Sequence, residues 1–331
     1  MRILVSGGAG FIGSHFVKRL KRSGDDVVVL DKLTYSGNRS NLPDDVEFHE
    51  GDIARPEDVA RAASGCEAIV NFAAETHVDR SILGATDFGK TEFIGTQVLL
   101  EAARDNGLRL VQVSTDEVYG DLASGSARES DPVRPSSPYS VAKAAGDLWI
   151  PAYVRTFGVD ASITRGSNTY GPNQYPEKLI PLFVTNALDG EPLPLYGDGR
   201  QVRDWLYVED HCAGIELVLR EGAAGEIYNI GGGDEHENIE VAERLLELTE
   251  ADRSLLRSVS DRPGHDRRYS LDTSKMRRLG WATATSFADG LRETVDWYRD
   301  NRAWWEPIKS GAYREYYEQQ YAARLAQATP V

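Results

Sequence analysis

The sequence is poor in cysteine, and its two cysteines show no pattern associated with a function. Cys66 and Cys212 lie far apart, and neither has a second cysteine or a histidine at metal-binding spacing. A disulfide framework and a structural zinc site are therefore not indicated. We expect two buried thiols and no metal site.

The chain also lacks long apolar runs and an excess of positive charge. No apolar run approaches the length needed to cross a bilayer, and Met1 leads directly into a short strand without a signal-peptide pattern. Lys and Arg number 37 against 52 Asp and Glu, a formal net charge of −15, which repels nucleic acid and anionic membranes. We expect a cytoplasmic protein that binds neither nucleic acid nor membrane.

What is present is an alternation of short apolar strands with helical segments. The length of 331 residues and the 41% hydrophobic content suffice for two domains with sizeable cores. Alternation of this kind predicts a parallel sheet with right-handed crossovers. The predicted strands are residues 2–6, 27–30, 68–72 and 108–113, and the predicted helices between them are residues 11–20, 56–63 and 93–103.

The alternation stops after Ile163. Turn-rich stretches follow at 170–176 and 196–199, and amphipathic helices are predicted at 239–248 and 287–298. Because residues 225–230 again have the pattern of a sheet strand, two lobes are expected to interleave in sequence.

The predicted fold is thus α/β, a Rossmann-type doubly wound parallel sheet with a smaller, interleaved C-terminal α/β substrate lobe. Its expected boundaries are 1–167 plus about 200–231 for the first domain, 168–199 plus about 232–321 for the second lobe, and 322–331 for a tail whose residues 326–331 are frayed.

A glycine pattern marks the first strand-to-helix turn. Gly7, Gly10 and Gly13 form G-x-x-G-x-x-G, where missing side chains let backbone amides approach a pyrophosphate at the positive end of a helix. Three glycines alone are weak support, since glycines are common in tight turns. Here the strand, the turn, the helix and a later acidic residue agree, which predicts a dinucleotide site.

That acidic residue is Asp31, at the end of the second strand. Its carboxylate can accept hydrogen bonds from the adenosine ribose and repels the extra phosphate of NADP, so NAD is favoured despite the neighbouring Lys32. Asp52 and Ile53 follow the third strand at a place suited to adenine, although Gly51 and Asp52 equally fit an ordinary turn.

Tyr139 and Lys143 lie four residues apart, on one face of a helix whose start is marked by Ser137 and Pro138. A nearby ammonium lowers the pKa of a tyrosine, which can then exchange a proton with a substrate hydroxyl while the lysine orients the cofactor ribose. Taken alone the pair is more often an ordinary surface pair. Its place after a dinucleotide fold favours catalysis.

Thr115, Asp116 and Glu117 follow the strand at 108–113, at the sheet edge where open α/β sheets bind ligands. Two adjacent acids can be a solvated end of a strand. They can also serve as one acid and one base for a dehydration, with Thr115 bonding the reacting hydroxyl beside Tyr139.

These motifs resemble those of the dTDP-glucose 4,6-dehydratases, in the extended short-chain dehydrogenase/reductase superfamily. The resemblance rests on residues 7–13, 31–35, 72–81 and 115–117, and it continues in the second lobe at 176–181, 196–199, 202–205, 261–269 and 301–305. It covers nearly the whole chain.

The resemblance implies a hydro-lyase that makes dTDP-4-keto-6-deoxy-glucose from dTDP-glucose. Tyr139 takes the C4 hydroxyl proton as NAD accepts the C4 hydride, Glu117 removes the C5 proton, and a protonated Asp116 donates to the departing C6 hydroxyl. Hydride then returns to C6, so NAD stays tightly bound and is regenerated in each turnover. Asp116 needs a raised pKa for this role.

The resemblance also assigns binding residues. For NAD they are Gly7, Gly10, Phe11, Ile12, Gly13, Asp31, Lys32, Leu33, Thr34, Asp52, Ile53, Phe72, Ala73, Ala74, Thr91, Tyr139, Lys143 and Thr169. For the substrate they are Thr76, Thr115, Asn168, Lys178, Leu179, Pro194, Tyr196, Arg203, Asn238, Arg262 and His265, of which Lys178, Arg203, Arg262 and His265 supply positive charge for the diphosphate. Residues 194–196 pack on thymine.

The chain departs from the family pattern at two places. Glu92 follows Thr91 where the family usually carries asparagine, and Thr169 stands where a second asparagine is usual. Both departures concern the surroundings of the cofactor. The family further implies a homodimer through a four-helix interface, here formed by residues 93–103 and 139–157.

Other readings stay open at this point. A sugar-nucleotide 4-epimerase shares the glycine turn and the Tyr139–Lys143 pair but needs no second acid and base, so Asp116 and Glu117 argue against it. A nucleotide-sugar decarboxylase or a CDP-glucose 4,6-dehydratase differs mainly in contacts to the carboxylate or the base. A non-catalytic NAD-binding sensor would not need Tyr139 and Lys143. The strictness of nucleotide preference and the downstream pathway are not fixed by sequence.

Overall fold

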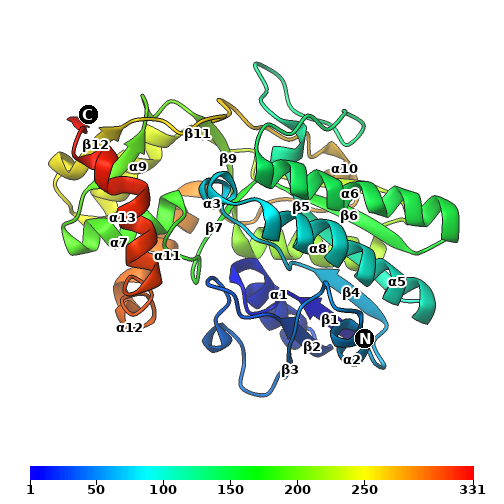
Figure 1. Cartoon of the computed structure of the whole chain (residues 1–331). Helices are drawn as coiled ribbons and strands as arrows, with labels where there is room; N and C mark the ends of the chain where they lie inside the picture. Colours follow the sequence, from blue (N-terminus) through cyan, green and yellow to red (C-terminus); the bar gives the residue numbers. More distant parts are fainter.

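A parallel sheet of seven strands lies at the centre of the larger lobe (Figure 1). The computed structural model describes all 331 residues. Every pair of neighbouring strands in this sheet is parallel. In spatial order the strands are β10 (Ile227–Ile230), β6 (Ala161–Gly166), β5 (Arg109–Thr115), β4 (Ala68–Asn71), β1 (Arg2–Ser6), β2 (Asp26–Asp31) and β3 (Glu47–Glu50).

Helices cover both faces of this sheet, which confirms the predicted doubly wound α/β fold. On one face α1 (Phe11–Arg22) packs beside α8 (Val208–Glu221), and their apolar residues share a core with β1 and β2. The other face is covered by α2 (Pro56–Ala62), α5 (Thr96–Asn106) and α6 (Pro138–Phe157). Burial on both faces explains why the central strands are almost continuously apolar.

The second lobe has a core of its own between two small sheets and three helices. One sheet is β11 (Glu235–Glu237), β9 (Val202–Tyr207) and β7 (Asn168–Tyr170); the other is β13 (Thr329–Pro330), β12 (Leu256–Val259) and β8 (Leu193–Tyr196). The helices are α7 (Leu179–Asp189), α9 (Asn238–Thr249) and α11 (Phe287–Asp300). Strand β9 joins the lobes, because Leu206 lies in the first core while Trp205 and Tyr207 lie in the second.

Five further helices are present. They are α3 (Val78–Leu83), α4 (Thr86–Gly89), α10 (Ser274–Arg278), α12 (Arg302–Trp305) and α13 (Ala312–Leu325). None of the helices combines the length and apolar character that crossing a membrane requires. Cys66 and Cys212 are free, buried thiols, as expected.

Two local expectations were wrong. Residues 326–331 are not frayed: β13 pairs antiparallel with β12, and the Val331 carbonyl accepts a hydrogen bond of 2.6 Å from Arg253. The helix expected at 93–103 is regular only from Thr96, because a π-helical turn, Lys90–Gly95, precedes it. That turn carries Glu92.

Candidate active site

A cavity of about 300 Å³ lies at the carboxyl ends of the main strands, and a second of about 130 Å³ adjoins it toward the second lobe. The first is lined by every residue predicted to hold the cofactor except Leu33, and by all five predicted catalytic residues. Of the predicted substrate residues, Thr76 and Thr115 line the first cavity and Pro194, Tyr196, Arg203, Asn238, Arg262 and His265 the second. Glu117, Asn168, Lys178 and Leu179 line both.

The glycine turn forms a close-fitting cradle at the start of α1. Gly7 has a φ of +71°, and a Cβ on Gly13 would lie 2.3 Å from the Gly7 carbonyl oxygen, so neither position accepts a side chain without backbone movement. Gly10 caps α1 without a side-chain hydrogen bond, which leaves the first amides of the helix for a ligand. These features fit a pyrophosphate.

Asp31 is held in place by two backbone amides. Its carboxylate accepts hydrogen bonds from Ala9 N at 2.9 Å and from Leu33 N at 2.8 Å. Leu33 does not line the cavity itself but donates its amide to Asp31, and its predicted cofactor contact stays a prediction. The ammonium of Lys32 lies 3.1 Å from Asp52, so its charge is already paired.

The start of α6 places Tyr139 and Lys143 in the first cavity. Ser137 and Ser140 form a reciprocal capping box, with Pro138 in the first turn. Lys143 Nζ donates a hydrogen bond of 2.8 Å to the Val113 carbonyl.

The pKa of Tyr139 differs from the sequence expectation. Burial raises this pKa well above the ordinary value, and Glu117, Glu92 and Asp116 add to the effect, while the Thr115 hydroxyl opposes it. The lysine alone does not make this phenol acidic, because burial and the charges of three carboxylates act in the opposite direction.

Asp116 and Glu117 have different surroundings although they are adjacent. Asp116 is 3% exposed, and Thr115 Oγ1 donates a hydrogen bond of 3.1 Å to its Oδ1. Burial raises the pKa of Asp116 well above its ordinary value, and Glu117 and Asp204 raise it further. Burial also raises the pKa of Glu117, but Arg262, Lys178 and Arg203 oppose this. The surroundings therefore favour the protonated form of Asp116 more strongly than that of Glu117.

Three basic side chains line the second cavity, of which Arg203 is buried and Lys178 and Arg262 are partly buried. Lys178 Nζ donates to the Thr76 carbonyl, and burial lowers the pKa of this lysine. Arg203 Nη2 donates a hydrogen bond of 2.9 Å to the Asp266 carbonyl, and Arg262 Nη1 one of 2.8 Å to Asp79. Positive groups held this firmly suit a dianionic diphosphate.

His265 does not add to this positive charge. Burial lowers its pKa to about 4, and Arg262 and Arg203 lower it as well. At neutral pH it is an uncharged ring whose Nδ1 lies 2.6 Å from Asp261. His265 lines the second cavity, so its predicted place beside the substrate stays a prediction, with a neutral ring rather than a cation favoured at this position.

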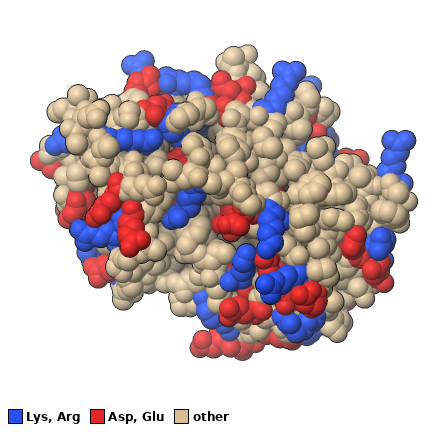
Figure 2. Space-filling view, viewed as in Figure 1, with Lys and Arg blue, Asp and Glu red and all other residues tan.

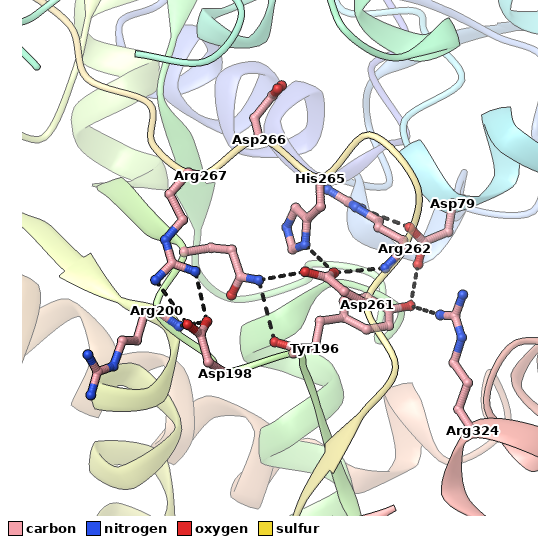
Figure 3. A network of polar contacts seen from close by, with 12 residues as sticks. Asp79, Tyr196, Asp198, Arg200, Asp261, Arg262, His265, Asp266, Arg267 and Arg324 are labelled. Carbon is pink, nitrogen blue, oxygen red and sulfur yellow. Dashed lines mark hydrogen bonds and ion pairs between the residues drawn. The ribbon is translucent and has the colours of Figure 1, made fainter. Parts of the chain in front are cut away.

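Sequence reasoning missed a polar network behind Tyr196 (Figure 3). The Tyr196 hydroxyl donates to Asp79, while Gln320 and Arg324 of α13 donate to that hydroxyl at 2.7 and 2.8 Å. Tyr321 also lines the second cavity and stacks on Tyr196 with 6.0 Å between ring centroids. Asp79 lies in the stretch 72–81 that carried the family resemblance, but no local pattern linked the C-terminal helix to this pocket.

Thr169, the second departure from the family pattern, lines the first cavity and contacts a buried histidine. Its hydroxyl lies 2.8 Å from Nδ1 of His211, whose Nε2 has no hydrogen-bond partner. Burial lowers the pKa of His211 to about 3. The ring is therefore neutral and adds no charge to the cavity.

Comparisons with known proteins agree with this geometry. The family model described as GDP-mannose 4,6 dehydratase matches residues 4–294. A dTDP-glucose 4,6-dehydratase from Streptomyces niveus is 56% identical over 323 residues, covering 94% of this chain and 96% of that protein.

Among solved structures, the sequence identity to a dTDP-glucose 4,6-dehydratase is higher than that to a 4-epimerase of similar fold. A dTDP-glucose 4,6-dehydratase from Streptomyces venezuelae, crystallised with NAD, superposes with a TM-score of 0.91 at 57% identity, covering 93% of this chain and 100% of the other. A UDP-glucose 4-epimerase from Thermus thermophilus with NAD reaches a TM-score of 0.87 at only 35% identity, covering 91% and 100%. The chain belongs to the dTDP-glucose 4,6-dehydratase family.

Proposed function

We propose that this chain converts dTDP-glucose to dTDP-4-keto-6-deoxy-glucose with a tightly bound NAD that is regenerated in each turnover. The observation that carries the proposal is the position of Asp116 and Glu117, which line the first cavity together with Tyr139 and Lys143 while Glu117 also faces the second. A dehydration needs this second acid and base in addition to the tyrosine. The names and the high identity of the relatives support the same activity.

The residues of the first cavity fit NAD. The glycine cradle suits a pyrophosphate, and the Asp31 carboxylate suits a ribose diol and disfavours a phosphate there. When bound, NAD supplies reversible storage of a hydride taken from the sugar and returned within one turnover.

The chain's own groups move the protons. Tyr139, oriented by α6, takes the proton of the C4 hydroxyl as the C4–H bond breaks, and Thr115 aligns that hydroxyl. The resulting ketone acidifies the C5 proton, which passes to Glu117. Asp116, held protonated by burial, gives its proton to the C6 hydroxyl, which leaves as water. Glu117 then returns a proton to C5 as the hydride is delivered to C6, which gives the 4-keto-6-deoxy sugar.

Groups around the second cavity place the nucleotide. Lys178, Arg203 and Arg262 bind the diphosphate, and Asn168 and Asn238 add neutral contacts. Pro194 and Tyr196, at the two ends of a short run on β8, pack on the thymine ring.

The test is mass spectrometry of dTDP-glucose incubated with the purified protein in deuterated water. The proposal requires loss of one water and gain of one deuterium at C5, without net formation of NADH. A product of unchanged mass with inverted C4 would establish the 4-epimerase instead. Turnover of CDP-glucose in preference to dTDP-glucose would move the assignment to the CDP-glucose dehydratases.

We also propose that two copies of the chain pair through α5 and α6. The side chains of Val141 and Leu148, seven residues apart on α6, are 53% and 62% exposed, and Phe93 beside them is 44% exposed. Figure 2 shows few charged side chains over α6. An apolar helix face of this kind favours a four-helix contact between copies. Sedimentation should give a dimer for the wild type and a monomer for Leu148→Glu; a wild-type monomer at working concentration would refute the pairing.

A further inference from the structure

Glu92 is buried behind the catalytic lysine and does not itself line the cofactor cavity. Its side chain is 1% exposed, and its Oε1 lies 3.0 Å from Lys143 Nζ, which is 5% exposed. Neither carboxyl oxygen has a well-aligned hydrogen-bond donor. The contact is therefore mainly one of charge with charge.

Two backbone features let the Glu92 carboxylate come close to Lys143. Glu92 lies in the π-helical turn Lys90–Gly95, a conformation that is rare and frequent at functional sites. On α6 the residue facing it is Gly146, where a Cβ would lie 3.2 Å from Glu92 Oε2. The absence of a side chain at Gly146 lets the acid approach Lys143 closely.

The charges near Glu92 come from three elements. Lys143 and Asp147 lie on α6, and Glu75 follows β4. Asp147 is itself paired with Arg165 of β6 at 2.9 Å, so Lys143 is the one nearby cation without another acid partner. Glu92 in turn is one of three carboxylates that raise the pKa of Tyr139.

We propose that Glu92 is a positioning residue that holds the Lys143 ammonium beside Tyr139 and cancels its charge within the cofactor cavity. This rests on the proposed function. A lysine has three N–H donors; one binds the Val113 carbonyl, and the ion pair with Glu92 holds the ammonium without a well-aligned hydrogen bond, so donor capacity remains for the cofactor ribose. Compared with a lysine that has no acidic partner, Lys143 paired with Glu92 stabilises the Tyr139 phenolate less. It also repels the positively charged nicotinamide of NAD less.

The first test is the variant Glu92→Gln, which keeps the shape and removes the charge. Because the lysine charge is then unopposed, the acidic limb of the pH profile of kcat/KM for dTDP-glucose should move down by about one unit. Glu92→Asp, which keeps the charge, should leave the limb in place even if kcat falls. Glu101→Gln, a charge removal on α5 next to Tyr153, is the matched control and should also leave it unchanged.

The second test needs no sugar turnover. NAD and NADH differ by one positive charge on the nicotinamide, so Glu92→Gln should weaken NAD binding relative to NADH by about three- to tenfold. A purely structural role would weaken both cofactors equally and leave the pH limb unshifted, and that pair of results would overturn the proposal. If Glu92→Gln does not fold, Glu92→Asn serves, since asparagine is usual in the family.

The two tests also separate this inference from the proposed function. A wild type that leaves dTDP-glucose unchanged refutes the proposed activity, while the ratio of NAD to NADH affinity still decides the role of Glu92.

Discussion

The hydroxyl of Tyr196, on strand β8 of the second lobe, lies 2.7 Å from Oδ2 of Asp79, on helix α3 of the first (Figure 3). The same carboxylate forms an ion pair of 2.8 Å with Arg262. Burial alone would raise the pKa of Asp79, but His77 and Arg262 outweigh it and bring the pKa to about 2. A charged Asp79 thus holds both Tyr196 and Arg262, two residues that line the second cavity.

Tyr196→Phe should therefore affect substrate binding more than the chemical step. Loss of a hydrogen bond to a charged group is worth about 1.5 kcal/mol, which corresponds to roughly a tenfold rise in KM for dTDP-glucose. Since Tyr196 does not line the first cavity, kcat should change little. Tyr317→Phe on the same helix as Arg324 is the control, because its hydroxyl faces Asn186 instead. If Tyr196→Phe lowered kcat by as large a factor as it raised KM, Tyr196 would affect the chemical step as well as substrate binding, and the prediction would be wrong.

Asp116→Asn should slow the loss of water more than the oxidation at C4. The amide cannot donate the proton that the buried acid carries, so kcat should fall by about 10²- to 10⁴-fold. Rapid mixing should then show a build-up of reduced nicotinamide absorbance during single turnover. Glu117→Gln should give a similar build-up and, in addition, suppress deuterium incorporation at C5. If either variant turned over substrate at the wild-type rate, the residue replaced in that variant would have no role as acid or base in the reaction.

Asp31→Asn should relax the preference for NAD over NADP. The amide no longer repels a 2′-phosphate and loses one acceptor for the amides of Ala9 and Leu33. We expect NAD affinity to fall about tenfold and the ratio of NADP to NAD affinity to rise. Fluorescence titration with both cofactors measures this. An unchanged ratio would mean that Asp31 only supports the loop.

His211 should make the protein less stable in mild acid. Its pKa is about 3 in the fold against an ordinary value of 6.5, so between these values the unfolded chain binds a proton that the folded chain does not. Its contribution is a loss of about 1.4 kcal/mol in the free energy of unfolding for each pH unit below 6.5.

Urea unfolding of His211→Gln between pH 6 and pH 5 checks this, because the variant should lose less stability over that range than the wild type. His49→Gln, at a less buried histidine on β3, should behave like the wild type. Parallel slopes for His211→Gln and wild type would contradict the prediction.

The parts of the fold that the sequence predicted are those with strong local patterns. The apolar segments at 2–6, 68–72 and 108–113 became β1, β4 and β5, and Ser137 with Pro138 marked the start of α6 correctly. Even the return of 225–230 to the main sheet was visible, because its residues are apolar and lead into glycines.

Long-range contacts were not predictable in the same way. The chain end pairs with β12 although residues 326–331 have little apolar periodicity, since the pairing depends on an edge strand far away in sequence. The lowered pKa of His265 follows from its burial in the folded chain and from Arg262 and Arg203, which come near it only in space. The 3.0 Å contact of Glu92 with Lys143 likewise requires the close packing of two helical segments.

The interleaving of the two lobes dictates an order of assembly during protein synthesis. The edge strand β10 completes the main sheet only after β7, α7, β8 and β9 have been made, so the nascent first domain must wait with an open edge beside β6. The second cavity is completed later still, because Tyr321 and Arg324 follow every strand of the main sheet in the sequence. A ribosome that stops before α13 would release a chain with its cofactor cradle complete and one wall of its nucleotide cavity absent.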